Sequence, residues 1–203
     1  MKLFGLGKLI VLLALLSPLG LAQPLEQTWV GAAKDSKAFV AIVAAQGRLL
    51  AYVCDGEKIA QWFRGAVGEG GAVAIELNSR TKLNARLTGD SASGTLELEG
   101  MRLEFTASRA TGSAGLFRAE LSANSATYTG GWIVNQRGEQ RGAVIGGGGF
   151  APSTSELLLG GGEAAGGTLC QGVRVTNGRT ANIQGVGRVA AWQVTPACIG
   201  ASR

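Results

Sequence analysis

The sequence predicts an all-β protein, an antiparallel meander that closes into a small β-barrel. Its 33 glycines among 203 residues fall between apolar runs without a fixed period, which is typical of many tight turns. Several runs of five to eight residues alternate apolar with polar side chains, the period of a half-buried strand. Closure would remove the exposed edges of such a sheet, so a barrel is preferred and a two-sheet β-sandwich is the alternative.

Residues 1–22 have the pattern of a secretory signal peptide: a short basic stretch, an apolar core and small residues before the cleavage site. Cleavage is expected between Ala22 and Gln23. A membrane anchor would need about 20 uninterrupted apolar residues, and Pro18 and Gly20 interrupt this run. We therefore expect a secreted or periplasmic protein without stable membrane insertion after cleavage.

The stretch 37–65 organises the predicted fold, because it holds the densest run of strand-forming residues. A two-residue turn at Gln46-Gly47 would fix the register of a hairpin. One face would carry Phe39, Ala41, Val43, Leu50, Tyr52 and Cys54, and the other Val40, Ile42, Ala44, Leu49, Ala51 and Val53. Strands that are apolar on both faces are usually covered by two layers. Asp55-Gly56 then turns the chain into 59–63, where Trp62 and Phe63 point to opposite faces.

The flanking segments complete the main sheet. A short strand at 28–31 precedes the hairpin. Two further strands, 72–77 and 83–87, follow it, and each has one apolar face, with Val73, Ile75 and Leu77 on that of the first, and one solvent-exposed face. A second hairpin, 94–105, turns at Glu99-Gly100, which would place Leu96, Leu98, Met101, Leu103 and Phe105 on the core face.

Beyond these, 116–121, 127–134 and 140–145 are expected strands, and Gly146 to Gly149 marks the best boundary. The predicted organisation is a signal peptide (1–22), an antiparallel β domain (23–150) and a glycine-rich linker with a disulfide-closed β-hairpin extension (151–203). That extension would hold a hairpin from 169 to 175 and a last strand from 188 to 194. Whether it packs on the main domain is left open.

Three cysteines in an exported chain predict one disulfide and one remaining thiol. Cys170 with Cys198 is the preferred pair, since both lie in the loop-rich C-terminal part and closing that loop would contribute roughly 3.5 kcal/mol. Cys54 would then be a buried thiol in a strand. The other two pairings stay open.

The charge and the absent residue types exclude several classes of function. Loss of Lys2 and Lys8 with the signal peptide lowers the formal charge from +5 to +3, with basic residues scattered singly, so no nucleic acid partner is expected. The chain has no histidine, which removes imidazole-activated nucleophiles and histidine-bearing metal sites. No cofactor and no metal site is expected.

Two motifs carry weak signals for chemistry. Asp55 and Glu57 could supply the paired carboxylates of a hydrolase, although Asp-Gly is also the expected residue pair of a hairpin turn. Gly185 to Ala190 has the letters of a dinucleotide-binding fingerprint, but no apolar strand precedes it and no helical pattern follows. We interpret Asp55 and Glu57 as turn residues, and we do not expect nucleotide binding at 185–190.

The aromatic residues offer the best candidate for a ligand site. Tyr52, Trp62 and Trp132 would lie near one mouth of a barrel and could bind a small apolar ligand, although core packing is the commoner use of such residues.

Four segments, AYVCDG (51–56), WFRG (62–65), GLFR (115–118) and GWIV (131–134), resemble in this order a pattern of uncharacterised exported bacterial β-domain proteins. The resemblance covers about residues 28–145, and it implies a bacterial envelope context and no site residues. The meander is also similar in outline to lipocalin and avidin barrels, without their ligand motifs.

The expected function is that of a non-enzymatic binding or structural module of the bacterial periplasm or cell surface. A carboxylate-dependent hydrolase and an inhibitor or adhesin acting on a protein partner are the alternatives. The partner, a small apolar ligand or an envelope protein, is not identified by the sequence, and neither is the oligomeric state.

Overall fold

A computed structural model of the chain describes residues 25–123, 125–146, 149–152, 157–158, 179–183 and 187–201. The predicted signal peptide and the predicted hairpin at 169–175 lie outside these ranges. Almost all of the described chain is β-structure, which confirms the predicted class. Its elements are β1 (Gln27–Ala33), β2 (Phe39–Ala45), β3 (Arg48–Cys54), β4 (Ala60–Ala66), η1 (Glu69–Gly71), β5 (Ala72–Asn78), β6 (Thr81–Leu87), β7 (Ser91–Leu98), β8 (Met101–Arg109), β9 (Gly115–Ala123), β10 (Ala126–Val134), β11 (Gln140–Gly146), β12 (Gly149–Pro152), β13 (Leu157–Leu158), β14 (Arg179–Ile183), β15 (Gly187–Val194) and α1 (Pro196–Ala201).

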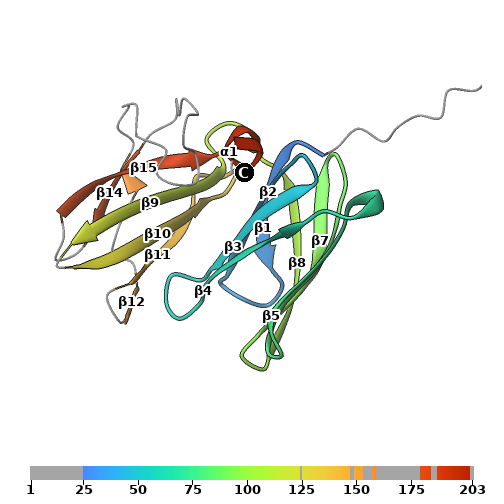
Figure 1. The fold of residues 1–203 in the computed structure, drawn as a ribbon, viewed down its shortest axis with the longest axis horizontal. Helices are drawn as coiled ribbons and strands as arrows, with labels where there is room; N and C mark the ends of the chain where they lie inside the picture. Colours follow the sequence, from blue (N-terminus) through green and yellow to red (C-terminus); the bar gives the residue numbers. More distant parts are fainter. Residues whose placement is uncertain are drawn as a thin grey trace, which may run out of the picture.

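The first eight strands form one antiparallel sheet that curls into a nearly closed barrel (Figure 1). Its order is β4-β3-β2-β1-β8-β7-β6-β5, so β4 and β5 are the two edges. The pairing of β2 with β3 has the predicted register, with Phe39 opposite Cys54 and Ala45 opposite Arg48. The pairing of β7 with β8 also agrees, with Leu98 opposite Met101. The two-residue turns fixed both registers, as expected from hairpin geometry.

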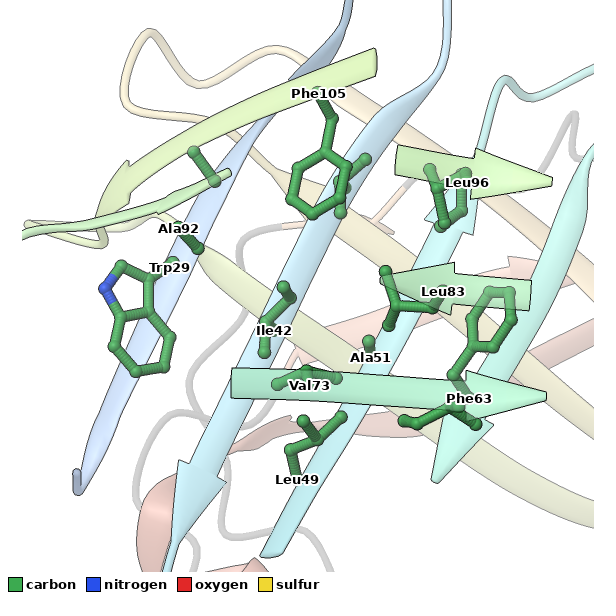
Figure 2. Packing of buried hydrophobic residues seen from close by; sticks show 14 of the residues in the cluster. Trp29, Ile42, Leu49, Ala51, Phe63, Val73, Leu83, Ala92, Leu96 and Phe105 are labelled. Carbon is green, nitrogen blue, oxygen red and sulfur yellow. The ribbon is translucent and has the colours of Figure 1, made fainter. Parts of the chain in front are cut away.

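The barrel interior is filled by its own apolar side chains, in what we call the barrel core. Figure 2 shows side chains from the barrel strands converging in this core, among them Trp29, Phe63 and Phe105. These three side chains are 0–2% exposed. The inward face of the central hairpin is the predicted one, and its members are Val40, Ile42, Ala44, Leu49, Ala51 and Val53.

Two side chains predicted for the core face of their strands are exposed. Leu77, which alternates with Glu76 in the predicted strand 72–77, is 46% exposed because the register irregularity between Glu76 and Asn78 falls on it. Met101 is 44% exposed, since it is the first residue of β8 and flanks the hairpin turn, where a side chain extends past the core.

The remaining strands form a second curled sheet in the order β12-β11-β10-β9-β15-β14-β13. Strand β15 pairs with β9, with Trp192 opposite Arg118 and Val194 opposite Leu116. The described strands therefore divide between the sheets in the loop after β8, whereas the sequence placed its boundary at Gly146–Gly149. The glycine run at 146–149 is a local signal, and it could not show that β15 pairs with β9, because that pairing joins residues more than 70 positions apart.

A second apolar cluster, which we call the middle layer, packs between the barrel and the second sheet (Figure 1). The barrel contributes the outward face of the central hairpin, again as predicted, and the second sheet contributes Leu116, Ile133, Ala143, Trp192 and Val194. The sequence offered barrel and sandwich as alternatives. The fold combines the two architectures. One wall of the barrel also forms one layer of a sheet-on-sheet packing with the second sheet.

Helix α1 ends the described chain and covers one end of the middle layer (Figure 1). Cys198 and Ile199 are buried in that layer, and the guanidinium of Arg48 donates to the Gly200 carbonyl at 3.2 Å. Six residues are too few to show a helical period, so the sequence did not predict this helix; Pro196 at its first position is the available signal.

None of the helices in the described ranges is long and apolar enough to cross a membrane.

Truncation of Ile199 tests whether the C-terminal helix belongs to the core. Ile199→Ala should lower the free energy of unfolding by about 2–4 kcal/mol, because the side chain is 3% exposed and its loss leaves a cavity. Urea unfolding followed by tryptophan fluorescence measures this change. Leu77→Ala, at an exposed position, is the control and should change it by less than about 1 kcal/mol. Equal stabilities of the wild type and the Ile199 variant would show that the helix is not part of the cooperative unit.

Candidate ligand-binding site

The structure brings together two of the three aromatic residues proposed from the sequence. Tyr52 in β3 is paired with Trp62 in β4, and their rings stack with centroids 4.2 Å apart at an interplanar angle of 29°. Both belong to the middle layer, where Tyr52 is fully buried. Trp132 lies in a separate cluster on the opposite face of the second sheet. The three side chains therefore share no surface, since Trp132 points away from the other two.

Gly131, next to Trp132, is the residue of β10 that faces Tyr52 and Trp62. A Cβ atom built on Gly131 would lie 2.6 Å from the Trp62 ring and 2.7 Å from Tyr52 Cζ. Real side chains do not make such short contacts, so only glycine allows the second sheet to come this close to the two rings. The alternation of side chains along β10 then sends Trp132 to the far face.

Two arginines of the second sheet lie over aromatic rings of the barrel. The guanidinium carbon of Arg118 lies 4.7 Å from the Trp62 ring centroid, and that of Arg141 lies 4.8 Å from Phe39. Arg118 also pairs with Glu120 at 2.9 Å, with both side chains less than one-fifth exposed. Cation–π contacts of this kind contribute roughly 0.5–2 kcal/mol each, so they add polar attachment points to the apolar middle layer.

Four short segments from different strands meet at this place. Tyr52, Trp62, Arg118 and Gly131 come one each from 51–56, 62–65, 115–118 and 131–134. Burial raises the pKa of the Tyr52 hydroxyl well above its usual range, and the neighbouring Cys54 thiol raises it further. The cluster is thus a tightly packed joint between the two sheets, in which burial favours the neutral form of the Tyr52 hydroxyl.

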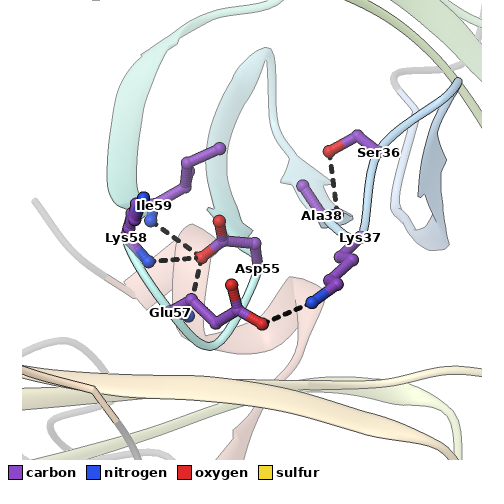
Figure 3. A network of polar contacts seen from close by, with 7 residues as sticks. All are labelled: Ser36, Lys37, Ala38, Asp55, Glu57, Lys58 and Ile59. Atoms are coloured by element: carbon purple, nitrogen blue, oxygen red, sulfur yellow. Dashed lines mark hydrogen bonds and ion pairs between the residues drawn. The ribbon is translucent and has the colours of Figure 1, made fainter.

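The candidate hydrolase carboxylates are both engaged in the turn after β3 (Figure 3). Asp55 Oδ1 accepts the backbone N–H groups of Glu57, Lys58 and Ile59, each at 2.8 Å. Partial burial acts to raise the pKa of Asp55, but these N–H groups outweigh it and hold the pKa below its usual range. Glu57 forms an exposed ion pair with Lys37 at 2.6 Å. The two acids act as turn residues here, and neither lines the two hollows described below.

Cys54 is a free, fully buried thiol in the middle layer, as expected. Cys198 is buried in the same layer, with its sulfur 3.7 Å from Thr195 Oγ1. Cys198 is disulfide-bonded, whereas Cys54 is free. Cys170, the remaining cysteine of the sequence, lies outside the described residues, so its pairing with Cys198 stays a prediction.

A hollow of about 600 Å³ lies on the outer wall of the barrel over β1, β7 and β8, and we call it the outer hollow. It is lined by residues 32–34, 93–95 and 104–106. A second hollow of about 370 Å³ shares Lys34 and Glu104 with it and continues along 102–104. The two form the concave region that we assign as the candidate binding surface.

The outer hollow exists because the sheet bends sharply and carries small side chains there. A Cβ on Gly94 would lie 2.0 Å from the Asn84 carbonyl oxygen, so the neighbouring strand crosses the space that a side chain would take. Such a bend spreads the outward side chains on the other face of the sheet. Those outward side chains are short at Ala32, Ser93 and Thr106, and they leave the wall hollowed.

The polar side chains of the outer hollow have no partners within the part of the chain that the structure describes. Ser93, Thr95, Thr106, Lys34 and Glu104 make no side-chain hydrogen bond or ion pair there. Neighbouring charges on the same wall are paired, with Arg102 bound to Glu97 at 3.2 Å and Lys82 to Glu76 at 3.3 Å. The outer hollow therefore offers uncommitted donors and acceptors.

The sequence held part of the signal for this surface. The register of the predicted hairpin 94–105 already sets Thr95 opposite Glu104, which the structure confirms. In the structure the same pairing extends beyond the predicted hairpin to Ser93 opposite Thr106. The sequence could not show that β1 lies beside β8, which brings Ala32 opposite Thr106 and Lys34 beside Glu104.

Comparison with known proteins finds no matching family model, no matching curated protein and no matching solved structure.

Substitution of Gly131 tests the close approach of the two sheets. Gly131→Ala should lower the free energy of unfolding by about 1–3 kcal/mol, because the added methyl group overlaps Trp62 and Tyr52. Urea unfolding of a protein of residues 23–203 measures it. Gly89→Ala is the matched control, since its Cβ meets nothing within 4 Å, and it should leave stability unchanged or raise it slightly. An equally stable Gly131 variant would contradict the assigned packing.

Substitution of Asp55 tests the turn after β3. Asp55→Ala should lower the free energy of unfolding by about 1–2 kcal/mol at pH 7, because three N–H groups lose their acceptor. The folded pKa is lowered, so this stabilisation is present above the unfolded pKa, about 3.9, and is lost as the pH falls through the folded value. Chemical unfolding of both proteins between pH 7 and pH 2 should therefore show their difference shrinking in acid.

The control for the turn is Glu57→Ala, which removes only an exposed ion pair and should cost less than about 1 kcal/mol. A difference between wild type and the Asp55 variant that grew in acid would contradict the assignment.

Proposed function

We propose that the protein is an exported, non-enzymatic binding module of the bacterial periplasm or cell surface, and that its ligand binds on the outer wall of the barrel. One contrast between the inside and the outside of the barrel supports this proposal. The interior is packed with its own side chains, whereas the outer hollow carries five polar side chains that make no hydrogen bond or ion pair within the described residues.

The packed interior argues against a ligand held within the barrel, as lipocalin-like binding would require. Trp29, Phe63 and Phe105 occupy the space that such a ligand would need. A small apolar ligand at Tyr52 and Trp62 would likewise have to part the barrel from the second sheet, because Gly131 packs against both rings. The outer hollow needs no such rearrangement.

The two alternatives have less support in the described residues. A hydrolase would use Asp55 and Glu57, yet the first is bound by three backbone N–H groups and the second by Lys37. An adhesin acting through the central hairpin would need an apolar patch there, and both faces of that hairpin are buried. A binding module that presents its wall is the function that these contacts favour.

Two measurements test the proposal. Expression of the complete chain in a Gram-negative host should yield a periplasmic protein whose first residue is Gln23, as read by mass spectrometry; a cytoplasmic, unprocessed chain would reject export. Titration with the apolar fluorescent probe N-phenyl-1-naphthylamine should give no saturable rise in fluorescence, because the core has no room for it. A saturable rise that Trp62→Ala removes would restore the aromatic site instead.

A further inference from the structure

We infer that the outer hollow binds a neutral, polyhydroxylated chain, that is, an oligosaccharide, laid across β1, β8 and β7. This inference rests on the proposed binding function and specifies its ligand. Three properties of the outer hollow support it: the kind of polar groups, their arrangement, and the charge around them.

The uncommitted groups of the outer hollow include donors, acceptors and hydroxyls that can act as either. Lys34 provides only donors, Glu104 provides only acceptors when ionised, and the hydroxyls of Ser93, Thr95 and Thr106 serve both ways. A sugar hydroxyl is also both donor and acceptor, so one sugar unit can satisfy either kind of partner. A ligand with donors only or acceptors only would leave part of this set unpaired at a cost.

The arrangement of these side chains follows two parallel rows across the sheet. Ala32, Thr106 and Ser93 lie opposite one another in one row. In the next row, Glu104 lies opposite Thr95. Lys34 stands at the end of this row, where its backbone N–H donates to the Glu104 carbonyl at 2.7 Å. Rows on one face of a strand are about 7 Å apart, because that face presents every second residue. A chain molecule lying across the strands would therefore meet a repeated set of polar groups.

The charge of the outer hollow favours a neutral ligand over a polyanion or a cation. Lys34 and Glu104 carry opposite charges and are not paired with each other, so the local balance is zero. Arg102, the nearest further cation in the adjoining hollow, is already bound to Glu97, and Asp35 adds an acid there. A polyanion would meet one free lysine beside two carboxylates, which is unlike the clustered cations that bind such polymers.

The outward side chains of the outer hollow are short, and most of them carry a polar group. Ala32 is the apolar member among them, and Phe105 contributes its backbone while its ring is buried in the barrel core. Much of the accessible lining is carbon, so the dodecanoate titration below tests an apolar ligand directly.

The test is a titration of the mature ¹⁵N-labelled protein, residues 23–203, followed by amide chemical shifts. The neutral probes are maltohexaose, cellohexaose and chitohexaose; hexagalacturonate, sodium dodecanoate and a neutral glycine-serine hexapeptide represent the other ligand classes. At least one neutral oligosaccharide should shift the amides of 32–34, 93–95 and 104–106 in a saturable way. The anionic, apolar and peptide probes should shift them at least tenfold more weakly.

Two variants with a matched control locate the binding. Ser93→Lys, which fills the outer hollow, should weaken oligosaccharide binding at least tenfold. Ser122→Lys, on an exposed serine of β9, should leave it unchanged. Thr95→Val removes one hydroxyl at nearly constant shape and should weaken binding between about twofold and tenfold. Dispersed amide spectra and unaltered urea midpoints establish that each variant is folded.

The outcomes separate this inference from the proposed function. If the peptide, apolar or anionic probe shifts the same amides more strongly than any sugar, the outer wall is a binding surface and the assignment to oligosaccharides is wrong. If oligosaccharide binding survives Ser93→Lys, the site is misplaced. If none of the probes shifts these amides, both the inference and the outer-wall function are overturned.

Discussion

The double burial of the central hairpin is the constraint on which the rest of this structure depends. Strands β2 and β3 are apolar on both faces, so water must be excluded from both. The barrel covers one face with the barrel core, and the second sheet with helix α1 covers the other. Neither half of the molecule would be complete alone, because each supplies a surface that the other must bury.

The joint between the two halves is made mainly by packing. Tyr52 and Trp62 stack at its border, Gly131 allows the backbone of β10 to approach them, and Arg118 lies over the Trp62 ring. The indole nitrogen of Trp62 is buried and finds no hydrogen-bond partner among the described residues. Directional polar contacts act at the periphery of the middle layer, as between Arg48 and Gly200, while its centre is held by the exclusion of water.

The same curvature that closes the barrel accounts for the outer hollow. A sheet that bends inward at Gly94 crowds its inner face and separates the side chains on its outer face. Where these are short and hydroxylated, the wall keeps space and unused hydrogen-bonding groups together. The aromatic residues first proposed as a ligand site are not open to a ligand in the same way. The second sheet covers Tyr52, and Trp132 belongs to a cluster on the far face of that sheet. In this fold the aromatic joint is closed by packing, whereas the polar outer wall of the barrel is open to a ligand.

The sequence by itself determined whatever depends on neighbours along the chain. Two-residue turns fixed the registers of both hairpins, and alternation assigned every residue of the central hairpin to its correct face. Tertiary structure alone decided which strands far apart in sequence pair, as β15 does with β9 and β1 with β8. Those pairings move the division between the sheets, separate Trp132 from Trp62, and place Lys34 beside Glu104. The physical reason is that the hydrophobic effect is not directional. The apolar pattern of a strand therefore determines which of its faces is buried, but it does not determine which distant strand covers that face.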